Sequence, residues 1–275
     1  MPLSLNVQTW GVGKPTVLLL HGFAEGAFVW NHIAPVLAAH ATVAAVELRG
    51  HGDSPRGPEA HYEPTTYAED VLEVMKYRFA GRPVTLIGHS LGATVAIHVA
   101  SMARDQVHGL ALVDGGPGLN LDAIRHIHQQ FLAQSWFHES INSFTTELQR
   151  RYPLSDLRLL QGVAECALRS LPSGGYELKC DRQLLSIERP PDDALLWERL
   201  RSFDGPVRVI RGAMSAVLSL RAAASMANAL PDCRFYTVPM AGHAVMLDNP
   251  DEFLLAIERF LSEIHCNPCV EKAVL

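Results

Sequence analysis

Short, uninterrupted apolar runs recur along the chain and predict the strands of a buried sheet. They lie at residues 16–20, 41–46, 84–87, 110–113, 207–210 and 234–238. Runs of this length that are rich in β-branched residues, without polar alternation, are typical of strands covered on both faces of a parallel sheet. We therefore expect these segments to form one central sheet.

Helical periodicity occupies the intervals between these runs. Thr66-Tyr67-Ala68-Glu69 has the form of a capping box, and an apolar stripe follows it. Small residues over 91–102 and apolar residues at helical spacing over 250–264 predict two further helices. Strands that alternate with helices imply right-handed crossovers, so the predicted fold is α/β with a mostly parallel, doubly wound sheet.

One long segment, residues 119–203, departs from this alternation. It contains helical stretches at 123–134, 141–151, 157–171 and 195–203, and no clear strand. Because it lies between two predicted strands, we interpret it as a helical cap at 119–203, inserted into a core made of 1–118 and 204–265, with a tail at 266–275. His126, His128 and His138 fall in this insertion, and we expect them to be surface groups.

The charge of the chain narrows the classes of partner. The 275 residues carry a formal net charge of −6, whereas a nucleic-acid-binding protein normally needs a basic face. No basic run suggests an anionic membrane surface, and no apolar run approaches the ~20 residues that span a bilayer. The N-terminus lacks the pattern of a signal peptide. We expect a small-molecule partner, no nucleic acid and no membrane span.

The cysteines favour a reducing compartment. Their number, five, is odd and they are scattered, which fits reduced thiols and a cytoplasmic location better than a disulfide framework. Cys266 and Cys269 form a C-x-x-C pair, but only His265 lies close enough to add a ligand, so a loose tail is favoured over a metal site. No glycine-rich phosphate loop is present, and we expect neither a metal nor a cofactor.

A candidate nucleophile stands at the end of the run at 84–87. Gly88-His89-Ser90-Leu91-Gly92 follows this strand directly, and a helix is predicted after it. A serine on a sharp strand-to-helix turn has strained backbone geometry and needs small neighbours. The N-terminus of the helix directs N–H groups and a positive dipole end at the reaction site. This context makes Ser90 the predicted nucleophile.

Four segments at strand ends resemble the α/β-hydrolase superfamily: His21-Gly22-Phe23, the residues 49–54, the Ser90 segment and Ala241-Gly242-His243. The resemblance implies an α/β-hydrolase fold with an oxyanion hole made by the backbone N–H groups of Phe23 and Leu91. It also implies the chain order serine, acid, histidine, which selects His243 as the base. Residues 49–54 are expected to shape a loop behind the site.

The acid departs from the commonest pattern of that superfamily. Most relatives have an aspartate in a Gly-x-x-Asp segment after the strand at 207–210, but this chain has Ser215 there and no carboxylate between Arg211 and Leu230. Some branches place the acid one strand earlier, 24 residues after the nucleophile, where Asp114 stands. A neutral serine cannot stabilise an imidazolium as an anion does. We therefore expect Asp114 to be the acid; the alternative is that it only caps a turn before Gly115.

These parts predict a serine hydrolase that cleaves a carboxylic ester, a lactone or a thioester through an acyl-enzyme. Phe131, Trp136, Phe137 and Trp197 of the cap are candidate pocket walls, and they favour a small to medium apolar acyl group. Three alternatives remain open at this point: hydrolysis of a carbon–carbon bond, cofactor-free chemistry on the same scaffold, and a ligand-binding homologue without catalysis.

Overall fold

The central element is a seven-stranded sheet. The computed structural model describes residues 4–12, 15–57, 61–79, 82–186 and 192–266, and the strands of this sheet lie in the order β1-β3-β2-β4-β5-β9-β10. Their bounds are β1 Val7–Trp10, β2 Pro15–Leu20, β3 Thr42–Val46, β4 Val84–His89, β5 Val107–Val113, β9 Val207–Gly212 and β10 Cys233–Val238. Only β1 is antiparallel to its neighbour; the other pairings are parallel.

All of the strands predicted from apolar runs are present, and the predicted fold class is confirmed. Every residue of β3, β4 and β9 is buried, as expected for strands that are covered on both faces. β1 was not predicted, because a four-residue edge strand with partly exposed side chains carries no continuous apolar run. It pairs with β3 in a register that sets Val7 opposite Val46.

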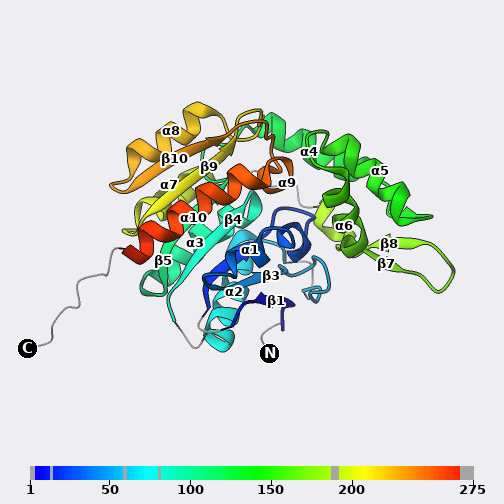
Figure 1. The fold of residues 1–275 in the computed structure, drawn as a ribbon, viewed down its shortest axis with the longest axis horizontal. Coiled ribbons are helices and arrows are strands. Elements are labelled where there is room, and N and C mark those ends of the chain that lie inside the picture. The colour runs from blue at the N-terminus through cyan, green and yellow to red at the C-terminus, as the bar shows by residue number, and fades with distance from the viewer. Residues whose placement is uncertain (1–3, 13–14, 58–60, 80–81, 187–191, 267–275) are drawn as a thin grey trace, which may run out of the picture.

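Helices cover the sheet, and most of the predicted ones are found close to their expected bounds (Figure 1). The helices outside residues 121–186 are α1 Ala34–Leu37, α2 Pro64–Arg78, α3 Leu91–Met102, α7 Asp193–Arg201, α8 Leu220–Ala229, α9 Val245–Asp248 and α10 Pro250–Cys266, with 3-10 turns η1 Ala27–Trp30 and η3 Arg104–Gln106. Trp30, Phe253 and Phe260 are fully buried in the core that these helices share with the sheet.

The cap stands to one side of the core, as the green ribbon in Figure 1 shows. It contains α4 Leu121–Ala133, α5 Ile141–Arg151, α6 Leu157–Ala167, η4 Arg182–Ser186 and a small sheet of β6 Phe137–His138, β7 Leu168–Ser170 and β8 Tyr176–Leu178. The expectation that this segment holds no strand was wrong. Strands of two or three residues carry no periodic signal, and here they are specified by antiparallel pairing with β8.

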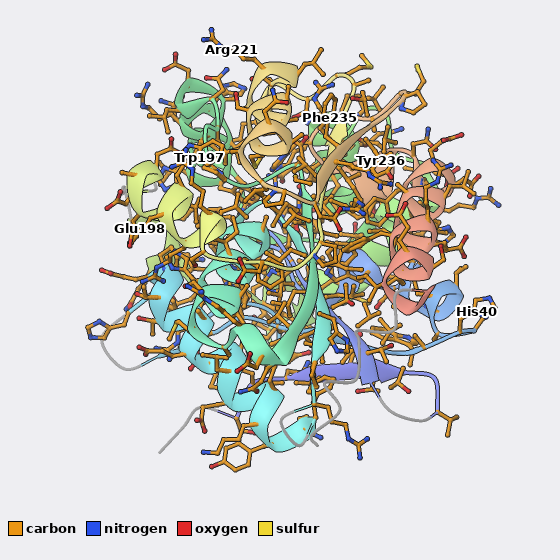
Figure 2. All side chains as sticks on the ribbon, turned by 90° about the vertical axis from the view of Figure 1, so that its left-hand side faces the viewer. His40, Trp197, Glu198, Arg221, Phe235 and Tyr236 are labelled. Atoms are coloured by element: carbon orange, nitrogen blue, oxygen red, sulfur yellow. The ribbon has the colours of Figure 1, made fainter. Side chains whose placement is uncertain are left out.

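Two further expectations about residues 119–203 need comment. His126 is exposed, but His128 is half-buried and His138 is buried, with its Nε2 3.0 Å from the carbonyl oxygen of Ser135. The surface assignment was therefore wrong for His138 and incomplete for His128. The second expectation concerns α7, which was predicted to belong to the cap. This helix packs against α3 of the core, and Figure 2 shows Trp197 on it.

The rest of the chain adds little to the site. Among the described residues, no helix is long and apolar enough to cross a bilayer. Residues 267–275, which include Cys269 of the C-x-x-C pair, lie outside the described part of the chain.

Candidate active site

Ser90 occupies a strained turn between β4 and α3. Its φ of 51° and ψ of −111° lie where non-glycine residues are rarely found. The turn is so tight that an added Cβ at Gly88 would lie 2.2 Å from the carbonyl oxygen of Gly92. The Ser90 N–H donates to the carbonyl oxygen of Val113 at 2.9 Å, which fixes the turn to the end of β5. The backbone thus presents Ser90 at the carboxyl edge of the sheet.

His243 and Asp114 are in direct contact. The Nδ1 of His243 lies 2.8 Å from the Oδ2 of Asp114, whose side chain is completely buried. The other carboxylate oxygen, Oδ1, accepts the Gly212 N–H at 3.1 Å, and the Ser215 hydroxyl donates to Oδ2. With Nδ1–H donating to a carboxylate, Nε2 of the neutral ring is left as the acceptor. That is the tautomer that a general base needs.

The loop of His243 lies against the turn that carries Ser90. The ring of His89, the residue before Ser90, is 4.7 Å from the ring of His243, and its Nε2 donates to the backbone oxygen of His243 at 2.9 Å. No hydrogen bond among the described residues joins the Ser90 hydroxyl to His243. Such contacts are often long without substrate and shorten in the reacting complex.

The two predicted oxyanion-hole donors are not used elsewhere. Among the described hydrogen bonds, none has the N–H of Phe23 or of Leu91 as its donor. The Leu91 N–H belongs to the first residue of α3, where N–H groups have no partner inside the helix. The Phe23 ring lies 5.5 Å from the ring of Phe131 and 6.0 Å from that of His128, so the loop after β2 contacts the cap.

Glu25 is a residue that the sequence reasoning missed. Its carboxylate is 3.0 Å from Nδ1 of His89 and accepts the Gly22 N–H at 2.7 Å. Burial alone would raise the pKa of Glu25, but the adjacent His89 and the Gly22 N–H outweigh it and lower this pKa well below its usual value. Burial likewise disfavours the His89 cation, yet the Glu25 carboxylate raises the pKa of His89. The available signal was one glutamate in an otherwise apolar segment at 23–30.

Asp248 is a second carboxylate near His243, also missed. It accepts the Gly242 N–H at 2.8 Å and the Ser155 hydroxyl of the cap at 2.5 Å. Burial raises the pKa of this carboxyl group above its ordinary value. Its oxygens bond to the backbone before His243 and to the cap, whereas the imidazole itself bonds to Asp114.

A small cavity lies between the core and the cap. Its volume is about 30 Å³, well below the roughly 300–1,000 Å³ of a typical ligand pocket. Ala24 and Leu247, close in sequence to Phe23 and His243, line it on the core side, whereas Ser90 and His243 are not among the residues that line it. Most of the cap side is apolar: Phe131, Phe144, Leu148, Val163, Ala167 and Leu178.

Of the predicted wall residues, one lines the cavity and the other three do not. Phe131 is buried and lines the cavity. Trp136, Phe137 and Trp197 are not among the lining residues: Arg182 stacks on Trp136, Phe137 is half exposed, and Arg201 stacks on Trp197. Among the residues described, no group of three or more histidine, cysteine, aspartate or glutamate side chains could hold a metal ion.

Comparison with known proteins identifies the family of the chain and solved structures of the same fold. The model of the family described as "Alpha/beta hydrolase family" matches residues 17–256. The 2-(acetamidomethylene)succinate hydrolase of Mesorhizobium japonicum is 29% identical over 94% of this chain and 92% of its own length. The pimeloyl-[acyl-carrier protein] methyl ester esterase of Chromobacterium violaceum is 29% identical over 94% of this chain and 98% of its own. A crystal structure of E-2-(acetamidomethylene)succinate hydrolase superimposes with a TM-score of 0.84 at 28% identity, covering 94% of this chain and 95% of the other.

Proposed function

Because the chain belongs to the alpha/beta hydrolase family, we propose that it is a serine hydrolase that cleaves a carboxylic ester, a thioester or a lactone. The observation that carries this proposal is the 2.8 Å contact between His243 and the buried Asp114. His243 lies in a loop that packs on the strained turn of Ser90. The name of one similar protein, a methyl ester esterase, supports ester cleavage, whereas the name of another supports only hydrolysis in general.

The proposed mechanism assigns one task to each group. His243 Nε2 takes the proton of Ser90, the Ser90 oxygen attacks the carbonyl carbon, and the leaving group takes the proton from His243. The N–H groups of Phe23 and Leu91 bind the oxyanion, and one such donor is typically worth about 3–4 kcal/mol. Asp114 keeps the proton of His243 on Nδ1 and stabilises the imidazolium. Water, activated by His243, then releases the acid.

The cavity supports a short acyl group. Its walls are mainly apolar and its volume is about 30 Å³, so a longer chain requires the cap side chains to move aside. Since Ser90 is not among the lining residues, we assign this space to the acyl chain and not to the reacting carbonyl. A p-nitrophenyl acetate-to-octanoate series tests this, with the highest kcat/KM expected for the shortest chains.

A second candidate substrate class is favoured by Arg151, which makes the same cavity partly cationic. Its side chain is 11% exposed, lies over the ring of Phe131 at 4.3 Å and bonds to Gln134 at 2.8 Å. It also donates to the Glu147 carboxylate at 3.3 Å, and the charged side chains of Glu25 and Lys179 line the same cavity. A guanidinium in an apolar cavity suits an acyl group that ends in a carboxylate, and the name of one relative contains a succinate.

Matched esters separate the two classes. A p-nitrophenyl hemisuccinate turned over better than the butyrate supports the anionic class, and Arg151→Gln should then abolish that preference. The exposed neighbour Arg150, changed to Gln, is the control and should leave the preference intact. A preference for butyrate in the wild type contradicts the anionic class.

Labelling with a fluorophosphonate tests the central claim. Covalent capture of the wild type, abolished in Ser90→Ala, supports a serine hydrolase. A folded wild type that is neither labelled nor active on esters contradicts it and favours a ligand-binding homologue.

A further inference from the structure

A buried side-chain pair outside the proposed triad links the three loops that carry the catalytic groups. Glu25 and His89 are 8% and 1% exposed, and their hydrogen bonds reach the oxyanion-hole loop, the nucleophile turn and the base loop. The mechanism above uses neither side chain. Each hydrogen bond of the pair nevertheless ends within one or two residues of a group that the mechanism uses, or on the backbone of such a group.

On the oxyanion-hole side, the Glu25 carboxylate fixes the loop after β2. It accepts the Gly22 N–H at 2.7 Å, one residue before Phe23. The carbonyl oxygen of Gly22 accepts from Nδ1 of His21 at 2.8 Å, and Nε2 of His21 accepts the Leu48 N–H at 3.0 Å. Both polar backbone groups of Gly22 are therefore held, so side chains help to set the direction in which the Phe23 N–H points, together with the Glu25 N–H, which donates to the Gly22 oxygen at 3.3 Å.

On the other side, His89 connects this loop to Ser90 and His243. Its Nδ1 faces Glu25 at 3.0 Å, and its Nε2 donates to the backbone oxygen of His243 at 2.9 Å. His89 directly precedes Ser90 on the turn. The imidazole of His89 thus bonds to both the oxyanion-hole loop and the loop of His243, and the nucleophile is the next residue in the chain.

The sequence leaves space for this pair at one position. An added Cβ at Gly22 would lie 2.8 Å from the Glu25 carboxylate and 2.8 Å from Nδ1 of His89. Any other residue at 22 would push the two side chains apart. The Glu25–His89 pair, as well as the turn after β2, therefore explains why residue 22 is glycine.

We propose that Glu25 and His89 are positioning residues that set the distance between the oxyanion-hole loop, Ser90 and the loop of His243. The inference rests on the proposed function. Both bonds of Glu25 end on one oxygen, Oε2, which accepts the Gly22 N–H and faces Nδ1 of His89. A glutamine keeps both contacts only through its amide oxygen, and this requires a proton on Nδ1 of His89. A neutral ring with its proton there has no proton on Nε2 to donate to the His243 oxygen.

The test compares two substitutions of different length. Glu25→Asp keeps the charge but retracts the carboxylate by one methylene, so it cannot reach Gly22 and His89 together. We expect kcat for a p-nitrophenyl ester to fall at least about tenfold, with KM within about twofold, because misplacement acts on the transition state. Glu25→Gln keeps the length of the side chain but not the anion that favours a proton on both nitrogens of His89, so we expect its kcat to lie between those of Glu25→Asp and the wild type.

Glu47 provides the matched control. It is equally buried and its carboxylate bonds to the N–H groups of Ala27 and Asp53 at 3.3 and 2.6 Å, none of which belongs to the proposed machinery. Glu47→Asp can lower the thermal midpoint, but we expect kcat to stay within about threefold of the wild type. If Glu25→Asp does not fold, His89→Asn, whose amide is too short to reach the His243 oxygen, takes its place with the same expected loss.

Three results would overturn the inference: a kcat for Glu25→Asp within about threefold of the wild type, the same kcat loss in Glu47→Asp, or a Glu25→Gln variant as impaired as Glu25→Asp. These results leave the proposed function intact, because each presupposes an active wild type. An inactive, unlabelled wild type instead refutes the proposed function, and the catalytic role of the pair with it.

Discussion

Replacing Asp114 by asparagine tests the most unusual element of the proposed triad. Gly212 N–H is a fixed backbone donor 3.1 Å from Oδ1, so the oxygen of an asparagine must take that position. Its NH₂ group then faces Nδ1 of His243 in place of Oδ2, which lies 2.8 Å away in the wild type. Nδ1 must become the acceptor, and the ring proton moves to Nε2.

The magnitude follows from this tautomer switch. With a proton on Nε2, His243 cannot take the proton of Ser90, and no anion remains to stabilise the imidazolium. Loss of both functions lowers kcat by about 10³–10⁴-fold in serine hydrolases with this geometry, or about 4–5.5 kcal/mol of transition-state stabilisation. The fold should survive, because the Ser215 hydroxyl can turn to accept from the new NH₂ group.

The assay is kcat for a p-nitrophenyl ester, with the thermal midpoint measured in parallel. Asp248→Asn is the control, since that carboxylate bonds to the Gly242 N–H and to Ser155 but not to the imidazole; we expect a loss below about tenfold. An Asp114→Asn variant that keeps more than about a tenth of wild-type kcat, or a larger loss in Asp248→Asn, would refute the assignment of the acid.

Four further substitutions probe other parts of the structure. Ser215→Ala removes one donor from Asp114 but leaves the hydrogen bond between Asp114 and His243, so kcat should fall by at most about tenfold; a loss equal to that of Asp114→Asn contradicts this. Gly92→Ala puts a Cβ 2.3 Å from the Leu20 carbonyl oxygen and should lower the free energy of unfolding in urea by about 1–3 kcal/mol. The Cβ of Gly162→Ala meets nothing within 4 Å in α6, so this variant should have a free energy of unfolding about 0.5–1 kcal/mol higher than the wild type. A Gly92→Ala variant more stable than Gly162→Ala would count against the tight packing of Gly92 at the turn. Burial, with His21 nearby, lowers the pKa of His51 to about 3, so protons favour the unfolded chain below about pH 6.5 and stability falls as the pH drops from there towards 3. His51→Gln should reduce the slope of unfolding free energy against pH by up to about 1.4 kcal/mol per pH unit, and an unchanged slope would refute the cause.

The sheet could be predicted from the sequence because each buried parallel strand is one apolar run. Leu18, Leu19 and Leu20 of β2 are all fully buried, so burial alone specifies the pattern. The strands of the cap could not be predicted in this way. β6 has two residues, and their partners lie in β8, so pairing distant in sequence, and not local periodicity, produces them.

The same distinction applies to the candidate site. Ser90 and His243 could be singled out because each follows a strand in a short motif with small neighbours. Glu25 could not be assigned a role, since its partner His89 is 64 residues away and a lone glutamate in an apolar segment does not indicate which residue it pairs with. Trp136, Phe137 and Trp197 were chosen as aromatic residues of the cap, and that property does not reveal which side of a helix or strand faces the cavity.

The position of Asp114 can be explained by the order of the strands. β5 and β9 are neighbours in parallel register, with Val113 opposite Ile210, and the Asp114 N–H donates to the Ile210 carbonyl oxygen at 2.7 Å. A carboxylate at the end of either strand therefore reaches the same space beside His243. Moving the acid from the β9 loop to β5 requires only that the β9 loop offers donors in place of an anion, and Gly212 N–H and the Ser215 hydroxyl provide them. Asp114 itself has a φ of 44°, a left-handed conformation that aspartate adopts more readily than most residues. This conformation fits a turn cap as well as an acid, so the observation that favours the acid is the 2.8 Å contact between its carboxylate and Nδ1 of His243.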